Sequence, residues 1–343
     1  MGFGIKTRIK KYLTSRYGLF DELINIRISP VGFFCNAACP MCWRMNISPK
    51  EIKGAVKGES SRLTLEEYKQ LFADIPKSIR TVDVVGGGEP LMFPKISELF
   101  KIVKQKNISG ILITNGSLLN EGVIHDLISC NWDKVRISIH AASSKIYLKI
   151  FGVQYFEKVI QNIKLLIKMR GKVQHPWISM LFVIQRNNVS EVIKFARLAQ
   201  SLKVDEIEFD SLIPTNLSLM LKPNQRKNVI RDLIKLKSVL KIQHNINDVL
   251  EMFSQHPLWS NDGKNKDYHK DKFCQIVQSN VDIGSDGNVV PCCIAYGYYK
   301  YSNIREKSLE RIWKDGRKFR NELLMGKFRS FCYKMCNYKL AKK

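Results

Sequence analysis

The feature that most constrains the fold of this chain is a group of three cysteines, Cys35, Cys39 and Cys42, spaced C-x3-C-x2-C in one short loop. The loop follows a mostly apolar, strand-like run from Ile26 to Phe34. Three thiolates this close together can each bind one iron of a cubic 4Fe-4S cluster, and the fourth iron then keeps a position for a non-protein ligand. The spacing therefore predicts a metal centre with one open iron.

A zinc site and a disulfide framework are the alternative uses of these cysteines. Zinc usually takes four ligands, commonly in paired C-x2-C knuckles, and the next cysteine along the chain is the isolated Cys130. Disulfides are typical of secreted proteins, whereas this chain of 343 residues has no secretory signal and an odd number of cysteines, nine. We therefore favour an iron-sulfur protein of the reducing cytoplasm, in which Cys130, within an apolar helix, is a core residue.

Short β-rich runs alternate with amphipathic segments between residues 26 and 214, which predicts successive βα units and a parallel sheet. The expected strands are 26–34, 80–85, 110–114, 134–140, 177–184 and 205–210, and the expected helices are 65–73, 94–106, 120–130, 155–170 and 190–202. Six such units predict an α/β fold, a partial (β/α)6 TIM-like barrel. Thr64 and Glu67 predict a capping box, and Pro30 favours an edge position for the first strand.

The loops that follow the strands of a parallel barrel converge on one mouth. The cysteine loop follows the first expected strand, and Gly87-Gly88-Glu89-Pro90 follows the second. Together these two motifs resemble those of the radical S-adenosylmethionine (SAM) enzymes. The resemblance implies that Cys35, Cys39 and Cys42 hold a 4Fe-4S cluster whose open iron binds SAM. An electron from the cluster then cleaves SAM to a 5'-deoxyadenosyl radical, which takes a hydrogen atom from substrate.

The same resemblance implies which side chains contact SAM. Gly87, Gly88 and Glu89 would hold the methionyl amine, and Ser138, at the end of the fourth strand, would meet the ribose. Arg186, after the fifth strand, would pair with the carboxylate. The complete set of expected SAM contacts is Met41, Gly87, Gly88, Glu89, Pro90, Asn115, Ser138 and Arg186.

Three further residues near the expected mouth are catalytic candidates. His140 follows the fourth strand, where it is either a proton acceptor that faces substrate or a polar residue satisfied at the barrel rim. Glu206, Glu208 and Asp210 alternate along the sixth strand and therefore share one face. Glu208 and Asp210, nearest the mouth, are candidates to bind or deprotonate substrate, and structural ion pairing is the alternative for both.

The last part of the chain contains five more cysteines. Asp286-Gly287-Asn288 predicts a hairpin turn that returns the strand after Cys274 beside the strand that bears Cys292. This region resembles the SPASM and twitch domains, which hold auxiliary clusters in radical SAM enzymes. A full SPASM domain has seven cysteines, so the resemblance implies one auxiliary 4Fe-4S cluster here. The expected ligands are Cys274, Cys292, Cys332 and Cys336, with Cys293 as an alternative to Cys292 and zinc as the alternative metal.

The expected organisation has four parts: a basic amphipathic segment at 1–25, the barrel at 26–215, a helical connection and linker at 216–270, and the auxiliary-cluster region at 271–343. The first segment predicts either a helix that closes the barrel or an interfacial helix, which would allow peripheral membrane contact. A helix needs a run of about eighteen apolar residues to span a bilayer, and the sequence contains no such run.

The formal net charge of +25 favours an anionic partner or substrate, or it reflects a generally basic, solvated surface. The expected reaction is hydrogen abstraction followed by oxidation of the substrate radical through the auxiliary cluster. Dehydrogenation of a sugar-like or phosphorylated small molecule fits this reaction by analogy. A reductase such as flavodoxin or ferredoxin would supply the electron. The alternatives are radical modification of a ribosomally made peptide and, from another class, a non-catalytic iron-sulfur scaffold or electron carrier.

Overall fold

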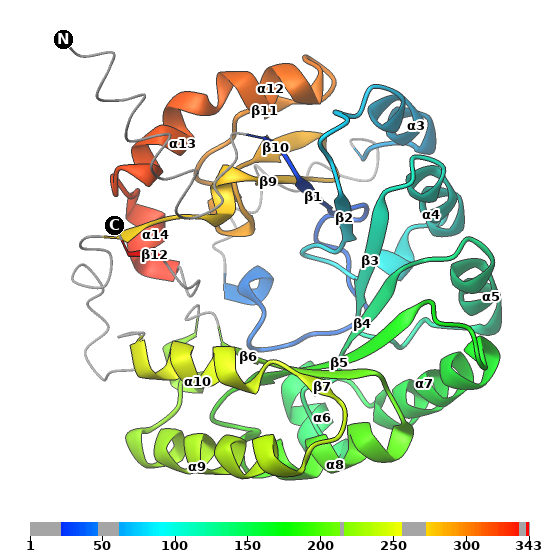
Figure 1. The fold of residues 1–343 in the computed structure, drawn as a ribbon, viewed down its shortest axis with the longest axis vertical. Helices are drawn as coiled ribbons and strands as arrows, with labels where there is room; N and C mark the ends of the chain where they lie inside the picture. The colour runs from blue at the N-terminus through cyan, green and yellow to red at the C-terminus, as the bar shows by residue number, and fades with distance from the viewer. Residues whose placement is uncertain (1–21, 47–61, 213–215, 256–271, 336–340, 343) are drawn as a thin grey trace.

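The computed structural model describes residues 22–46, 62–212, 216–255, 272–335 and 341–342. Within these residues, most strands form one sheet in the order β11-β10-β9-β1-β2-β3-β4-β5-β6-β7. Its parallel part consists of β1 (Asn25–Ile28), β2 (Thr81–Val84), β3 (Ser109–Thr114), β4 (Lys134–Ser138), β5 (Trp177–Ile184) and β6 (Glu206–Ser211). The sheet curves around a central space (Figure 1). The expected partial barrel of parallel βα units is confirmed.

Helices cover the outer face of the sheet (Figure 1). They are α3 (Leu65–Ala73), α4 (Ile96–Lys104), α5 (Glu121–Ser129), α6 (Ser144–Phe151), α7 (Phe156–Arg170), α8 (Val192–Leu202), α9 (Pro223–Val239) and α10 (Ile246–Gln255). One row of neighbouring strand residues, Ile28, Val84, Leu112 and Val135, points outward and is fully buried. Because side chains alternate along a strand, the residues between them lie on the inner, concave face of the sheet, which we call the lumen.

The region after β6 adds more than a helical connection. A short strand, β7 (Gln243–His244), pairs in parallel with β6, and α10 follows it. The sheet therefore extends by a further βα unit beyond the six that the sequence predicts. Helix α6, between β4 and α7, is also additional to the predicted elements. None of the described helices is long and apolar enough to cross a membrane.

The C-terminal region joins the barrel sheet directly. Strand β9 (Asn280–Ile283) runs parallel to β1, and β10 (Asn288–Val290) returns antiparallel beside it before β11 (Ser302–Asn303). The predicted hairpin around Gly287 is present, and this glycine has φ +80°. Strand β1 therefore lies inside the sheet, and its predicted edge position is wrong. Pro30 does not disrupt the pairing because β1 ends at Ile28.

Three short helices, α12 (Leu309–Asp315), α13 (Arg317–Leu324) and α14 (Ser330–Met335), complete the C-terminal region, together with β8 (Lys272–Phe273) and β12 (Ala341–Lys342). A small apolar core lies among them, formed by Val277, Val290, Ile294, Ala295, Phe319, Leu323 and Phe331. The basic segment predicted at 1–25 lies almost entirely outside the described residues.

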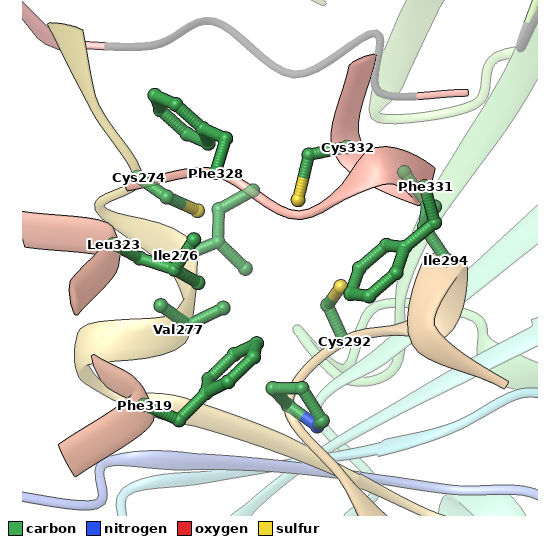
Figure 2. A pocket seen from close by; sticks show the side chains of 11 residues that line it. Cys274, Ile276, Val277, Cys292, Ile294, Phe319, Leu323, Phe328, Phe331 and Cys332 are labelled. Atoms are coloured by element: carbon green, nitrogen blue, oxygen red, sulfur yellow. The ribbon is translucent and has the colours of Figure 1, made fainter. Parts of the chain in front are cut away.

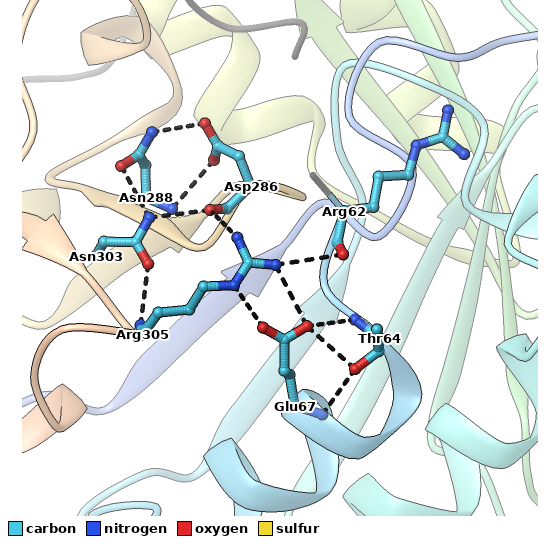
Figure 3. Close-up of polar contacts among 7 residues, drawn as sticks. All are labelled: Arg62, Thr64, Glu67, Asp286, Asn288, Asn303 and Arg305. Carbon is cyan, nitrogen blue, oxygen red and sulfur yellow. Dashed lines mark hydrogen bonds and ion pairs between the residues drawn. The ribbon is translucent and has the colours of Figure 1, made fainter. Parts of the chain in front are cut away.

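An arginine fastens the C-terminal region to the barrel (Figure 3). Arg305 forms an ion pair with Glu67 at the start of α3, and it donates to the carbonyl oxygens of Arg62 (3.3 Å) and Asp286 (3.1 Å). Glu67 is also part of the predicted capping box, which the structure confirms: its carboxylate accepts from the Thr64 N–H at 2.8 Å. A single carboxylate therefore both caps a barrel helix and binds the C-terminal region.

Candidate active site

The three cysteines Cys35, Cys39 and Cys42 lie in the loop after β1, at the carboxyl end of the parallel strands. The loop is held from both sides: the Ala38 N–H donates to the Phe151 carbonyl (2.9 Å), and Arg44 donates to the Ala37 carbonyl (2.7 Å). Burial raises the pKa of Cys39 to about 12, and the neighbouring Cys42 and Cys35 thiols add to the rise. Thiols that raise each other's pKa need a bound cation in order to ionise together.

This thiol group suits a cluster better than a single ion. Among the described residues, no three cysteine, histidine or carboxylate side chains are grouped tightly enough to hold one metal ion. A cubic cluster places its irons apart and brings its own bridging sulfides, so each thiolate binds a different iron. The charge of Arg44 favours the ionised form of Cys35 and Cys39. The residues of the loop therefore fit a 4Fe-4S cluster.

The motif after β2 packs directly on the cysteine loop. A Cβ atom on Gly88 would lie 2.0 Å from the carbonyl oxygen of Phe34, so only glycine allows this approach. The N–H of the next residue, Glu89, donates to that same carbonyl oxygen at 2.8 Å. Gly88 and Glu89 therefore lie against Phe34, the residue before Cys35, and the contacts of Gly87, Gly88 and Pro90 with SAM stay predictions.

The carboxylate of Glu89 is buried and already accepts three hydrogen bonds. The donors are the Thr114 hydroxyl (2.5 Å), the Asn115 N–H (2.8 Å) and the Leu91 N–H (3.2 Å). Burial raises the pKa of Glu89 to about 7, although these donors favour its ionised form. In this structure the carboxylate joins the ends of β2 and β3. Its contact with the SAM amine stays a prediction.

A closed set of polar contacts joins the cysteine loop to the end of β3. Asn115 donates to the Asn36 side-chain oxygen (2.8 Å), and Asn36 donates to the Ser117 hydroxyl (2.8 Å). Ser117 completes the set by donating to the Asn115 side-chain oxygen at 2.6 Å. Asn36 lies directly after Cys35, yet the sequence alone did not single it out. A polar residue between two metal-ligating cysteines is the signal that would have found it.

The end of β5 contributes a second residue that the sequence alone did not single out. The Gln185 side chain is 1% exposed, and its amide nitrogen lies 2.9 Å from the sulfur of Met41 in the cysteine loop. Its side-chain oxygen is buried and has no hydrogen-bond partner among the described residues. The adjacent Arg186 donates through Nε to the Met220 carbonyl at 2.9 Å. Met41 and Arg186 thus lie on the same side of the barrel, and their contacts with SAM stay predictions.

His140 is the satisfied polar residue rather than a group open to substrate. It is 4% exposed, its Nδ1 lies 3.0 Å from both the Val183 backbone nitrogen and the Leu181 carbonyl oxygen, and its ring stacks on Phe151. Burial lowers the pKa of His140 to about 3, so the ring is neutral at physiological pH. The role of proton acceptor facing substrate is therefore corrected, because the ring serves the packing behind the strands.

Glu208 also has a structural role. Its carboxylate forms ion pairs with Lys134 (2.9 Å) and Arg136 (2.8 Å) on β4, and it accepts from the Ser179 hydroxyl at 2.7 Å. Burial opposes its ionisation, but Arg136, Ser179 and Lys134 outweigh burial and lower the pKa of Glu208. A carboxylate with this many donors is a weak base, so its candidacy as a catalytic base is corrected to that of an ion-pair partner.

Asp210 lies two residues closer to the mouth on the same face of β6. Its carboxylate accepts from the N–H of Ser211 (2.7 Å), and no basic side chain of the described residues forms an ion pair with it. Burial raises the pKa of Asp210, with Arg136 opposing the rise. Of the three catalytic candidates, Asp210 is therefore the carboxylate without an ion-pair partner among the described residues, and its catalytic role stays a prediction. Ser138 faces the same lumen from the end of β4.

Among the described strand residues, the lumen wall combines three basic and five acidic side chains. Neighbouring strands place Asp282, Arg27 and Asp83 in one row, and Arg27 lies 3.8 Å from Asp83 and 3.7 Å from Asp282. Burial raises the pKa of Asp282 to about 6. The basic residues are Arg27, Lys134 and Arg136, and the acidic residues are Asp83, Glu206, Glu208, Asp210 and Asp282. The lumen therefore has an excess of carboxylates although the chain as a whole is strongly basic.

The C-terminal cysteines line a second site, an apolar pocket (Figure 2). Cys274, Cys292 and Cys332 contribute thiols to it, together with Ile276, Val277, Pro291, Ile294, Phe319, Leu323, Phe328 and Phe331. Cys293 does not line the pocket, which favours its neighbour Cys292 as the ligand. Burial raises the pKa of Cys332 to about 11, and nearby Cys274 adds to the rise. The predicted fourth ligand, Cys336, lies outside the described residues.

The two cysteine sites lie toward opposite ends of the parallel strands. Cys35 follows the carboxyl end of β1, whereas Cys274 precedes β9, which is parallel to β1. Cys292 follows β10, which runs in the opposite direction, so it also lies toward the amino ends of β1 and β9. The charged lumen lies on the strands that connect these two ends.

Comparisons with known proteins agree with this geometry. Residues 29–199 match the radical SAM superfamily, and residues 274–338 match the SPASM family, described as an iron-sulfur cluster-binding domain. A probable GTP 3',8-cyclase of Saccharolobus islandicus is 29% identical over 231 residues, which cover 67% of this chain and 70% of the relative. A tungsten-containing aldehyde ferredoxin oxidoreductase cofactor-modifying protein of Pyrococcus furiosus is 24% identical over 303 residues, which cover 81% and 78% of the two chains.

Two solved structures have a similar fold. SuiB of Streptococcus suis bound to S-adenosylmethionine gives a TM-score of 0.66 at 15% identity and covers 95% of this chain and 72% of SuiB. Native anSMEcpe with bound AdoMet gives a TM-score of 0.63 at 17% identity and covers 92% and 88% of the two chains. At these identities the likeness establishes the fold alone.

Proposed function

Because this chain belongs to the radical SAM superfamily and has a C-terminal SPASM iron-sulfur domain, we propose that it oxidises a hydroxyl- or amine-bearing small molecule bound in the barrel lumen. The family makes the protein a radical SAM enzyme with a SAM-binding 4Fe-4S cluster and an auxiliary iron-sulfur centre. The cluster supplies the electron that cleaves SAM to a 5'-deoxyadenosyl radical. In the proposal Cys35, Cys39 and Cys42 hold this cluster.

The proposed SAM site is formed by residues at the mouth. Gly87 and Gly88 bring the backbone after β2 against the cysteine loop and so offer it to the methionyl group. Arg186 would pair with the SAM carboxylate, and Ser138 would bind the ribose. The unpartnered, buried oxygen of Gln185 is a further acceptor beside Met41. A bound ligand with hydrogen-bond donors would satisfy this oxygen.

The proposed substrate class depends on which charged side chains of the lumen already have an ion-pair partner. Arg27, Lys134 and Arg136 each lie within ion-pair distance of carboxylates, so binding a phosphate in the lumen would require existing pairs to break. Asp210, by contrast, has no basic partner among the described residues. Groups that donate hydrogen bonds are the natural complement of a carboxylate. This favours the sugar-like part of the predicted substrate class over its phosphorylated part.

Oxidation of a hydroxyl-bearing carbon to a carbonyl removes one hydrogen atom, one proton and one electron from the substrate. SAM bound at the cluster would supply a 5'-deoxyadenosyl radical, to which a hydroxyl-bearing carbon of the substrate would lose a hydrogen atom, so that 5'-deoxyadenosine and a substrate carbon radical would form. This radical would then lose one proton, which Asp210 would accept, and one electron. The loss of both converts the hydroxyl-bearing carbon to a carbonyl group. Cys274, Cys292 and Cys332 would hold the auxiliary iron-sulfur centre, which would supply the acceptor for this electron. The burial that raises the pKa of Asp210 makes its carboxylate a better proton acceptor.

The relatives suggest competing substrates. By name, the Saccharolobus relative is a probable GTP 3',8-cyclase, and GTP has a triphosphate. A triphosphate would need basic side chains beyond the three paired ones in the lumen. Solved structures of SuiB and anSMEcpe include complexes with peptides, but they share only the fold with this chain. The substrate test must therefore distinguish peptide modification, as well as reaction with GTP, from oxidation of a sugar-like molecule.

The enzyme class is tested by anaerobic reconstitution with iron and sulfide, followed by incubation with SAM and dithionite. We expect about eight irons per chain and formation of 5'-deoxyadenosine. The triple variant Cys35→Ala, Cys39→Ala, Cys42→Ala should retain about four irons and form no 5'-deoxyadenosine. Wild-type protein that binds iron but never cleaves SAM, with any reductant, would favour the scaffold or electron-carrier alternative.

The substrate class is tested by deuterium transfer. The reconstituted enzyme is incubated with SAM and, separately, with carbon-deuterated sugars and amino sugars, with deuterated GTP, and with deuterated peptides. Deuterium in 5'-deoxyadenosine from a sugar, together with a carbonyl product, is the expected result. Transfer from GTP or from a peptide would contradict the substrate proposal while leaving the enzyme class intact. Asp210→Asn should abolish the carbonyl product but retain hydrogen abstraction.

A further inference from the structure

Tyr147 on α6 has a buried hydroxyl group without a partner. The residue is completely buried, and its oxygen has no hydrogen-bond partner among the described residues. An unpaired buried hydroxyl is unfavourable, and native structures leave few of them unexplained. The group therefore indicates a partner that the described residues do not supply.

Helix α6 ends against the cysteine loop. The carbonyl of Phe151, its last residue, accepts from the Ala38 N–H at 2.9 Å, between Cys35 and Cys39. A Cβ atom on the next residue, Gly152, would lie only 2.8 Å from the Ala38 carbonyl oxygen. The Tyr147 ring stacks on the Phe151 ring, with centroids 4.3 Å apart. Tyr147 is thus fixed in the layer that supports the cysteine loop.

Three of the four ionisable groups that act on the Tyr147 hydroxyl, Cys39, Glu89 and Cys35, belong to the candidate cluster site, and the fourth and weakest is Tyr155. Burial raises the pKa of Tyr147, and Cys39, Glu89 and Cys35 add to the rise in that order. The phenol therefore keeps its proton and can act as a donor. Glu89 already accepts three hydrogen bonds from other residues. Among the groups of the cluster site, the sulfur atoms at the cysteine loop are therefore the acceptors that remain.

We propose that the Tyr147 hydroxyl donates a hydrogen bond to a sulfur atom of the cluster held by Cys35, Cys39 and Cys42, and that this bond sets the reduction potential of the cluster. The inference rests on the proposed function, because it requires the cluster at this loop. Hydrogen bonds to cluster sulfurs favour the reduced, more negative state and raise the potential. Tyr147 is a positioning residue in this scheme, because it acts on SAM only through the cluster.

Tyr68 provides a matched control. It is also completely buried, on α3, and its hydroxyl is likewise unpartnered within the described part of the chain. The charged groups near it are Glu67 and Arg305, and no cysteine is among them. Tyr68→Phe and Tyr147→Phe therefore remove the same atom from equally buried positions, one with no cysteine among the ionisable groups that act on it and one with two.

The experiment is a redox titration of anaerobically reconstituted wild-type, Tyr147→Phe and Tyr68→Phe enzymes. Electron paramagnetic resonance follows the signal that changes when SAM is added, which separates this cluster from the auxiliary one. In Tyr147→Phe we expect the equilibrium constant for one-electron reduction of the cluster to fall tenfold, which corresponds to a midpoint potential about 59 mV more negative. Tyr68→Phe should keep the wild-type midpoint. Metal-free Tyr147→Phe should melt no lower than the metal-free wild type, because it lacks the unpaired hydroxyl.

A Tyr147→Phe midpoint equal to that of the wild type would overturn the inference, and so would equal shifts in both variants. In either case the wild-type signal would still respond to SAM, and the proposed function would stand. If the wild type itself gave no SAM-responsive signal, the inference and the proposed function would both be overturned. Equal iron content in all three proteins ensures that a shift reports the potential rather than lost cluster.

Discussion

Removing the contact between Arg305 and Glu67 tests how firmly the C-terminal region is held to the barrel. Arg305, which follows β11, forms an ion pair with Glu67 at the start of α3 (Figure 3). The Arg305 guanidinium is the main reason that the pKa of Glu67 falls to about 2. Glu67 also accepts hydrogen bonds from Thr64. The pair therefore connects two regions that lie more than two hundred residues apart in the sequence.

The magnitude follows from this pKa. A fall from the ordinary 4.5 to about 2 corresponds to an upper limit of about 3.4 kcal/mol, at about 1.36 kcal/mol per pKa unit. The side chains of Arg305 and Glu67 are 39% and 29% exposed, so solvent screening reduces this to about 1 kcal/mol. For a chain of 343 residues, an unfolding entropy of about 2.1 cal/mol/K per residue converts 1 kcal/mol to a shift in Tm of about 1.4 °C.

The assay is a double-mutant cycle. The free energy of unfolding in urea is measured at pH 7 for the wild type, Arg305→Met, Glu67→Gln and the double variant, and we expect a coupling of about 1 kcal/mol. The exposed pair Glu66 and Lys69, on the same helix, is the control, with an expected coupling of about 0.3 kcal/mol. A coupling for Arg305 and Glu67 no larger than that of the control would refute the reasoning.

The coupling should also depend on pH in a defined way. Because the pKa of Glu67 is lower in the folded state than in the unfolded state, the contact stabilises the protein fully above the ordinary pKa of 4.5. The stabilisation is lost as the pH falls from 4.5 towards 2. The coupling should therefore be constant between about pH 6 and pH 8, and a coupling that changes within that range would point to another titrating group.

Three further predictions concern the cysteines, the lumen and the packing behind it. Cys292→Ser should lower the iron content by about four atoms per chain, whereas Cys293→Ser should not, because Cys292 lines the apolar pocket; equal losses in iron analysis would contradict this assignment. Glu208→Gln should lower the free energy of unfolding by about 3 kcal/mol, because Lys134 and Arg136 lose a shared carboxylate; an unchanged urea midpoint would argue against the ion pairs. The pKa of His140 is about 3 in the folded state and 6.5 in the unfolded state. Below pH 6.5 the unfolded state therefore binds a proton that the folded state does not, and the free energy of unfolding decreases as the pH is lowered. Asparagine tolerates the φ of +48° at this position, so His140→Asn should remove this pH dependence of about 1.4 kcal/mol per pH unit. Thermal melts followed by circular dichroism between pH 6 and pH 4 measure it, and the same pH dependence in the variant would contradict the prediction.

Local signals in the sequence were sufficient for much of the barrel. The expected positions of β2, β3, β5 and β6 agree with the structure to within a residue or two. The capping box of Thr64 and Glu67 and the hairpin at Gly287 were also predictable, because each depends on residues within a few positions of one another. The two motif loops fall at the same end of the sheet for the same reason: each directly follows a strand.

Contacts between distant residues could not be predicted in this way. The pairing of β1 with β9 joins positions about 255 residues apart, and no local pattern specifies it. The sequence shows that Glu208 is an acidic residue near the end of a strand. Its role depends on Lys134 and Arg136, which lie on β4 and come within reach only in the folded sheet. Cys292 and Cys293 are adjacent in sequence, and only the path of the chain after β10 decides which one lines the pocket.

The position of β1 inside the sheet has a consequence for expressing parts of this protein. Its backbone N–H and C=O groups pair with β2 on one side and with β9 on the other. A fragment that ends before β9 would leave one side of β1 as an open edge, beside the loop of cysteines. Open edges pair readily with other chains and promote aggregation. The barrel region should therefore be produced together with β9 and β10, even for experiments that concern only the first cluster.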